Sequence, residues 1–91
     1  MTSRIVVLEG LPIVPSTKHQ KLSNVIRKLV ESFGTIAENG FMMPQDAAGT
    51  SRGFAYVQLS TEAEAAQAIR LGNGYRLDTS HTFRVRAYQA P

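Results

Sequence analysis

The sequence predicts an α+β fold in which one four-stranded antiparallel sheet carries two helices on one face. Three observations support this prediction. Residues 52–59 alternate between two kinds of side chain, as strands do, and residues 22–33 repeat apolar side chains at helical spacing. The strand and helix signals along the 91 residues follow the order β-α-β-β-α-β.

The most informative strand is the run Arg52-Gly53-Phe54-Ala55-Tyr56-Val57-Gln58-Leu59. Successive side chains of a strand point to opposite faces of a sheet. One face of this strand is aliphatic and is predicted to be core: Ala55, Val57 and Leu59. The other face is aromatic and polar: Arg52, Phe54, Tyr56 and Gln58. We expect this second face to be either a stacking surface for nucleic acid bases or a half-exposed protein contact.

A buried central strand is predicted near the N-terminus. Arg4 is followed by the aliphatic run Ile5–Leu8 and then by Glu9-Gly10-Leu11-Pro12, whose Gly and Pro end the run.

The first helix is predicted from a capping box of Thr17 and Gln20 to Gly34, which ends it. Its core-facing stripe is Leu22, Val25, Ile26, Leu29, Val30 and Phe33. The charged side chains outside this stripe are mostly basic: Lys18, Lys21, Arg27, Lys28 and Glu31. The solvent side of the helix is therefore expected to be basic.

The middle of the chain supplies a second strand and a second helix. Residues 36–43 are predicted as a strand with a bulge or tight bend at Asn39-Gly40, and residues 44–51 as a flexible hairpin-type connection to the alternating strand. A capping box of Thr61 and Glu64 starts the second helix, whose stripe of small residues suits close packing on a sheet. Gly72-Asn73-Gly74 ends it.

A fourth strand is predicted after a polar loop at residues 75–82. The segment Phe83-Arg84-Val85-Arg86 alternates apolar and basic side chains, which directs Phe83 and Val85 inward and both arginines outward. The complete order is the ferredoxin-like split βαβ arrangement.

In this topology the first and third strands lie side by side at the centre of the sheet. Val7, Phe54 and Tyr56 are then expected to be neighbours on the open face. Arg84 and Arg86 are expected on the strand that flanks the first.

Composition narrows the class of protein. The chain is 43% hydrophobic, has no cysteine and carries a net charge of +3. It therefore has no disulfide framework or thiolate metal site, and no apolar run of the ~20 residues needed to cross a membrane. We expect a cytoplasmic monomer without a cofactor or a signal peptide. The excess of basic over acidic residues fits a nucleic acid or an acidic protein as partner, and it fits a merely solvated surface equally well.

Catalysis is not expected. His19 and His81 are far apart, and the chain lacks the closely spaced ligands of a zinc site. Gly72-Asn73-Gly74 ends a helix instead of opening one, so it is no phosphate-binding loop, and no nucleophile elbow is recognisable.

The alternating run resembles the octamer of RNA recognition motifs (RRMs), with a departure only at Leu59. The companion hexamer of that family is similar to Val6–Leu11, with Val7 at a position that is normally aromatic and Gly10 at one that is normally asparagine. The resemblance implies single-stranded or ribosomal RNA as a ligand. Val7 removes one stacking platform, so the binding is expected to be weak.

The RNA-binding candidates are Arg52, Phe54, Tyr56, Arg84 and Arg86. Phe54 is expected to pack on ribose and Tyr56 to stack on a base, while the arginines neutralise phosphates. The alternative is that the two rings are covered by residues beyond the fourth strand, such as Tyr88, or only stiffen the sheet.

A second resemblance covers nearly the whole chain. Its most specific part is Gly74-Tyr75-Arg76-Leu77-Asp78 with His81-Thr82-Phe83-Arg84-Val85, joined by Leu11-Pro12, Glu38-Asn39-Gly40 and Met43-Pro44. These segments resemble the family of the large RRM-bearing scaffold subunits of eukaryotic translation initiation factor 3. The resemblance implies that residues 1–91 are one RRM domain, with an ordered core at about 4–88, excised from a longer scaffold subunit.

The same resemblance implies docking of the partner subunits j and a on the helical side, the former through an acidic segment. Such a segment with an aromatic anchor needs a basic rim around an apolar notch. The candidates for this surface are Lys18, Lys21, Arg27, Lys28, Tyr75, Arg76 and Leu77. The alternative is that the lysines form a solvated helix face while Tyr75 and Leu77 close the core.

Overall fold

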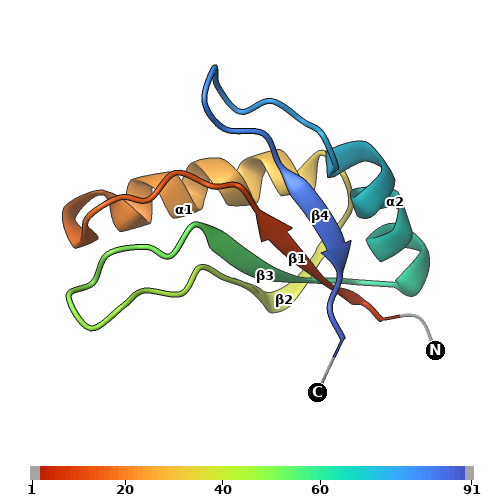
Figure 1. The fold of residues 1–91 in the computed structure, drawn as a ribbon. Helices are drawn as coiled ribbons and strands as arrows, with labels where there is room; N and C mark the ends of the chain where they lie inside the picture. The colour runs from red at the N-terminus through yellow and green to blue at the C-terminus, as the bar shows by residue number, and fades with distance from the viewer. Residues whose placement is uncertain (1–2, 90–91) are drawn as a thin grey trace.

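The computed structural model describes residues 3–89 and has the predicted order of elements (Figure 1). These are β1 (Ile5–Glu9), α1 (Ser16–Glu31), β2 (Ile36–Met42), β3 (Phe54–Leu59), α2 (Glu62–Gly72) and β4 (Arg84–Ala87). The strands form one antiparallel sheet in the order β2-β3-β1-β4. Both helices lie on one face of this sheet, which confirms the split βαβ prediction.

The core lies between the sheet and the helices. The inward side chains of β1, β3 and β4 are almost fully buried: Val6, Leu8, Ala55, Val57, Leu59 and Val85. They form one cluster with Ile26 and Val30 of α1 and with Ala65 and Ala68 of α2. Phe83 is also buried, as predicted, although it lies just before β4.

Val25 is an exception to the predicted stripe of α1. We expected it in the core, but 45% of it is exposed. The reason is geometric, because a helix buries only one stripe and Ile26 and Val30 occupy its centre. Val25 therefore lies at the edge of that stripe and contributes an apolar side chain to the surface.

The two helices begin differently. α1 starts at Ser16, after Pro15, and no side chain caps it, so the capping box predicted at Thr17 is wrong. Thr17 is already inside the helix, and the Gln20 amide donates to Asn24 instead of reaching back. The start of α2 is as predicted, since Thr61 Oγ1 accepts a hydrogen bond from the Glu64 N–H.

The Glu64 carboxylate links α2 to the segment before β2. It accepts hydrogen bonds from the Ser60 hydroxyl and from the Thr35 N–H, the latter at 3.2 Å. These bonds lower the pKa of Glu64 below its ordinary value, the Ser60 hydroxyl being the main cause.

The predicted irregularity in β2 is confirmed. Asn39 has a φ of 56°, and the pairing of β2 with β3 shifts register between Ile36 and Phe41.

The pairing of the two central strands continues beyond their ends. The Leu11 N–H donates to the Gly53 carbonyl at 3.0 Å, and the Ser51 N–H donates to the Val14 carbonyl at 2.9 Å. Ser51 is only 3% exposed, and its hydroxyl oxygen accepts from the Val14 N–H at 2.8 Å. The hydroxyl also donates to the Pro12 carbonyl at 3.3 Å. Ser51 thus ties the end of the β2–β3 connection to the segment after β1.

Candidate functional site

The face of the sheet without helices carries the predicted aromatic surface. The rings of Phe54 and Tyr56 are half-buried and meet edge to face, with centroids 5.5 Å apart. The Arg52 guanidinium carbon lies 5.9 Å from the centre of the Phe54 ring, which places all three side chains on one face, as expected.

A third ring extends this surface past β4. The Tyr88 ring lies edge to face with Tyr56, with centroids 5.7 Å apart and an angle of 87° between the rings. The sequence suggested Tyr88 only as a residue that could cover Phe54 and Tyr56. The contact exists, and it leaves both rings partly exposed.

The basic residues of this face are partly neutralised. Arg86 Nε lies 3.1 Å from Glu9 Oε1, and both side chains are solvent-accessible. Arg84 is exposed and stands opposite Glu9 in the β1–β4 register. Glu9 therefore offsets part of the positive charge that the two arginines of β4 provide.

Gly10 departs from the motif for a steric reason. Its φ of +84° is a conformation that side chains rarely adopt, and a Cβ built on it would overlap the Thr82 carbonyl oxygen. An asparagine has no room at this position, because the loop before β4 passes directly against the end of β1.

The helical side presents a basic and apolar surface along α1. Val25, Lys28, Leu29 and Ser32 line a shallow groove on this helix. The helical repeat places Lys18 and Lys21 on the same side as Val25. We call Lys18, Lys21, Val25, Lys28 and Leu29 the α1 surface.

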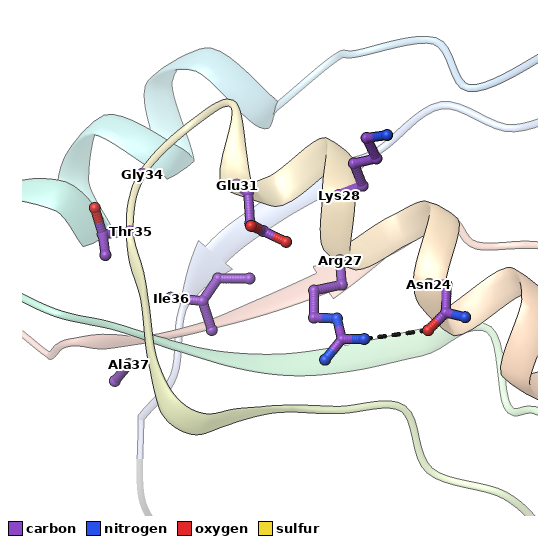
Figure 2. Close-up of a pocket in the computed structure, with 8 residues that line it drawn as sticks. All are labelled: Asn24, Arg27, Lys28, Glu31, Gly34, Thr35, Ile36 and Ala37. Atoms are coloured by element: carbon purple, nitrogen blue, oxygen red, sulfur yellow. Dashed lines mark hydrogen bonds between the residues drawn. The ribbon is translucent and has the colours of Figure 1, made fainter.

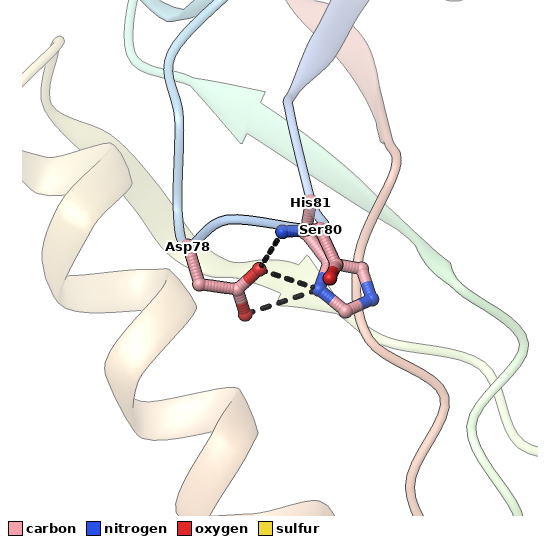
Figure 3. Close-up of polar contacts among 3 residues, drawn as sticks. All are labelled: Asp78, Ser80 and His81. Carbon is pink, nitrogen blue, oxygen red and sulfur yellow. Dashed lines mark hydrogen bonds and ion pairs between the residues drawn. The ribbon is translucent and has the colours of Figure 1, made fainter.

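The loop between α2 and β4 lies beside α1 (Figures 1 and 3). Tyr75 begins this loop, and its ring contacts Phe33 at 5.7 Å and Phe83 at 5.4 Å between centroids. Tyr75 is 38% exposed, whereas Leu77 is half-buried and packs on the core. Tyr75 thus both covers the core and reaches the surface, while Leu77 mainly closes the core.

Asp78 and His81 shape the tip of this loop (Figure 3). Asp78 Oδ1 accepts from the Ser80 N–H at 2.8 Å and lies 2.9 Å from His81 Nδ1. The bond from the Ser80 N–H, followed by the contact with His81, holds the pKa of Asp78 below its ordinary value. Arg76 is exposed next to this turn.

Arg27 does not share the α1 surface. It lines a groove of about 620 Å³ between α1 and the beginning of β2, and Lys28 borders both this groove and the one lined by Val25 and Leu29. In Figure 2 Arg27 points toward β2 and donates to Asn24 Oδ1 at 3.1 Å, while Lys28 points away. The two basic residues are adjacent in sequence but about 100° apart around the helix axis.

The histidines have structural contacts. His19 Nε2 lies 2.8 Å from the Met43 carbonyl oxygen, and His81 pairs with Asp78. Within residues 3–89, no group of three or more His, Cys, Asp or Glu side chains is arranged to hold a metal ion. None of the helices in that range is both long and apolar enough to span a membrane.

The family match agrees with the octamer at residues 52–59, whose aromatic side chains lie on the helix-free face. Residues 15–81 match the family model of the RNA recognition motif. The chain belongs to the RNA recognition motif family. A solved structure of the Rna15 RRM with bound RNA (GU) covers 97% of this RRM domain and 85% of its own chain, with a TM-score of 0.77 and 25% identity.

The RRM domain is also similar to curated translation factors. It is 38% identical over 85 residues to the B subunit of eukaryotic translation initiation factor 3 of Arabidopsis thaliana and 36% identical over 85 residues to that of Nicotiana tabacum. Each match covers 92% of the chain. The chain spans only 12% of the length of these relatives.

Proposed function

We propose that this RRM domain is a docking module of a translation initiation factor 3 scaffold subunit in the cytoplasm. It binds the partner subunits j and a, the former through an acidic segment, during assembly of the initiation complex on the small ribosomal subunit. The proposal takes the chain as one RRM of a longer scaffold subunit, and it is supported by the similarity to the B subunit of that factor over 92% of the chain.

The observation that carries the proposal is the combination of charge and apolar surface on α1. Lys18, Lys21 and Lys28 are exposed beside the groove that Val25 and Leu29 line. The lysines strengthen binding of an acidic segment through charge complementarity, and the groove strengthens it by burying an apolar or aromatic anchor.

The loop after α2 extends this surface. Tyr75 is partly exposed and Arg76 is exposed, next to the end of α1. An aromatic side chain of the partner could pack against the Tyr75 ring, and Arg76 adds a further positive charge beside it.

The test compares charge reversal on the two sides of α1. We expect Lys21→Glu with Lys28→Glu to weaken binding of an acidic peptide from subunit j about ten-fold or more, measured by calorimetric titration. Arg27→Glu is the matched control, because Arg27 is also an exposed basic residue of α1 but lines only the groove toward β2, whereas Lys28 borders the groove of Val25 and Leu29 as well. Unchanged affinity in the double variant, or an equal loss in the control, would contradict the proposal.

RNA binding by the helix-free face is a second candidate function. The observation that favours it is the row of Phe54 and Tyr56 with Arg52 beside it. Weak binding is expected, because Val7 replaces one aromatic platform and Glu9 pairs with Arg86. Chemical-shift mapping with single-stranded RNA at low and moderate salt tests it. An absence of perturbation at Phe54 and Tyr56 would exclude this role for the domain.

A further inference from the structure

We infer that Tyr88 is a base-stacking residue that takes the place of the aromatic residue missing at position 7. The inference rests on the second candidate function, RNA binding by the helix-free face. It assigns RNA contact to a residue that lies outside both the octamer and the hexamer of the family.

The first support is the burial of Val7. It is only 4% exposed, although it lies on the face that no helix covers and is not part of the core cluster. Its register partners are Tyr56 on β3 and Arg86 on β4. Side chains from the flanking strands must therefore close over Val7. Because valine is short, it leaves space above β1 for larger side chains from both neighbours.

The second support is the backbone position of Tyr88. Its N–H donates to the Ile5 carbonyl at 2.9 Å, which extends the pairing of β4 with β1 by one residue beyond Ala87. Alternation along the strand places Tyr88 on the same face as Arg84 and Arg86. Tyr88 is thus held against the sheet by a main-chain bond.

The third support is the ring contact itself. β1 lies between β3 and β4 in the sheet, so the Tyr56 and Tyr88 rings meet across β1. An aromatic side chain at position 7 would project into the same space. The contact between Tyr56 and Tyr88 fills that space from the side, at a centroid distance of 5.7 Å.

The result is a continuous row of three partly exposed rings, Phe54, Tyr56 and Tyr88. Arg52 lies at one end of the row, and Arg84 and Arg86 lie along β4. Aromatic platforms combined with basic side chains suit unpaired bases joined by phosphates, so the occupant is single-stranded RNA.

The experiment measures binding of a fluorescein-labelled (GU)₃ oligonucleotide by fluorescence anisotropy at low salt. We expect Tyr88→Leu to weaken binding about ten-fold, as loss of one stacking platform does, and Tyr88→Phe to bind nearly as well as the unaltered domain. Leu71→Ala is the control, because it truncates an exposed apolar side chain of α2 on the helical side and is expected to leave RNA affinity unchanged.

Tyr56→Leu separates the inference from the function on which it rests. If Tyr56→Leu weakens binding and Tyr88→Leu does not, RNA binding stands and the role of Tyr88 is overturned. If the unaltered domain does not bind the oligonucleotide, both are overturned. An upfield shift of the Tyr88 ring protons on addition of RNA is expected in the unaltered domain, and this readout does not depend on the folding of a variant. No shift would overturn the inference.

Discussion

Glu9 Oε1 lies 3.1 Å from Arg86 Nε, so an acidic side chain stands within the basic border of the helix-free face. Both side chains are solvent-accessible, which limits the contribution of the pair to stability to about 0–1 kcal/mol. Its larger effect is on the charge that the face presents to a ligand.

Glu9→Gln is therefore expected to raise affinity for single-stranded RNA several-fold at low salt. It frees Arg86 for one additional phosphate contact, which steepens the dependence of log affinity on log salt concentration by roughly 0.7. Anisotropy titrations at several salt concentrations measure both quantities. Glu31→Gln on α1 changes the net charge equally but lies on the other side of the domain. An equal gain in that control would mean that only the overall charge matters.

Gly10→Asn, which restores the usual residue of the family hexamer, is expected to destabilise the domain instead of improving RNA binding. The left-handed φ of +84° strains a residue with a side chain, asparagine less than most, and overlap of the new Cβ with the Thr82 carbonyl oxygen is the larger cost. We expect a loss of at least ~2 kcal/mol in urea unfolding. Gly74→Asn is the matched control, because its φ is +86° but nothing lies within 4 Å of the added Cβ. Equal losses in the two variants would rule out a steric cause.

Ser51→Ala is expected to lower the free energy of unfolding by about 1–3 kcal/mol, because it removes the buried hydroxyl that accepts from the partly buried Val14 N–H. Denaturant unfolding measures the loss. The exposed Ser80, whose backbone N–H makes the bond to Asp78, is a suitable control, and Ser80→Ala should change stability by less than about 0.5 kcal/mol. Similar values for both serines would show that the Ser51 hydroxyl is dispensable.

Asp78→Asn is expected to change the dependence of stability on pH. The folded-state pKa of Asp78 lies below its ordinary value of 3.8, so the carboxylate stabilises the fold above that value. This contribution is lost as the pH falls through the lower folded-state pKa. The variant should therefore be less stable than the unaltered domain at neutral pH, and the difference should vanish in strong acid. Thermal unfolding across this range measures it. A stability difference that stays constant down to the acid limit would contradict the assigned role of Asp78. Thr79→Ala is the control, because it changes no titratable group and should give a difference that does not vary with pH.

Much of the fold was predictable because its signals are local. The alternation around Phe54 and Tyr56 and the inward Phe83 and Val85 follow from periodicity alone, and the structure confirms them. The Thr61 cap depends on residues three apart and was also predictable. The capping box at Thr17 failed because Pro15 allows the helix to begin earlier.

The features that sequence reasoning missed depend on distant neighbours. Periodicity places Arg27 on the solvent side of α1, but it does not say that β2 flanks that side. The reason for glycine at position 10 is the carbonyl of Thr82, far along the chain. The contact of Tyr88 with Tyr56 depends on the short side chain of Val7 on the strand between them. A partial signal was present, because Tyr88 continues the even-numbered alternation of Arg84 and Arg86.

The hydrogen bonds that Ser51 makes to Val14 and Pro12 have a consequence for binding entropy. Together with the bond between Leu11 and Gly53, they fix the chain at the end of the sheet where β1 finishes and β3 begins. The backbone that leads into Arg52 and Phe54 is thus already ordered before any ligand binds. A ligand on this face would lose little affinity to ordering of the protein backbone.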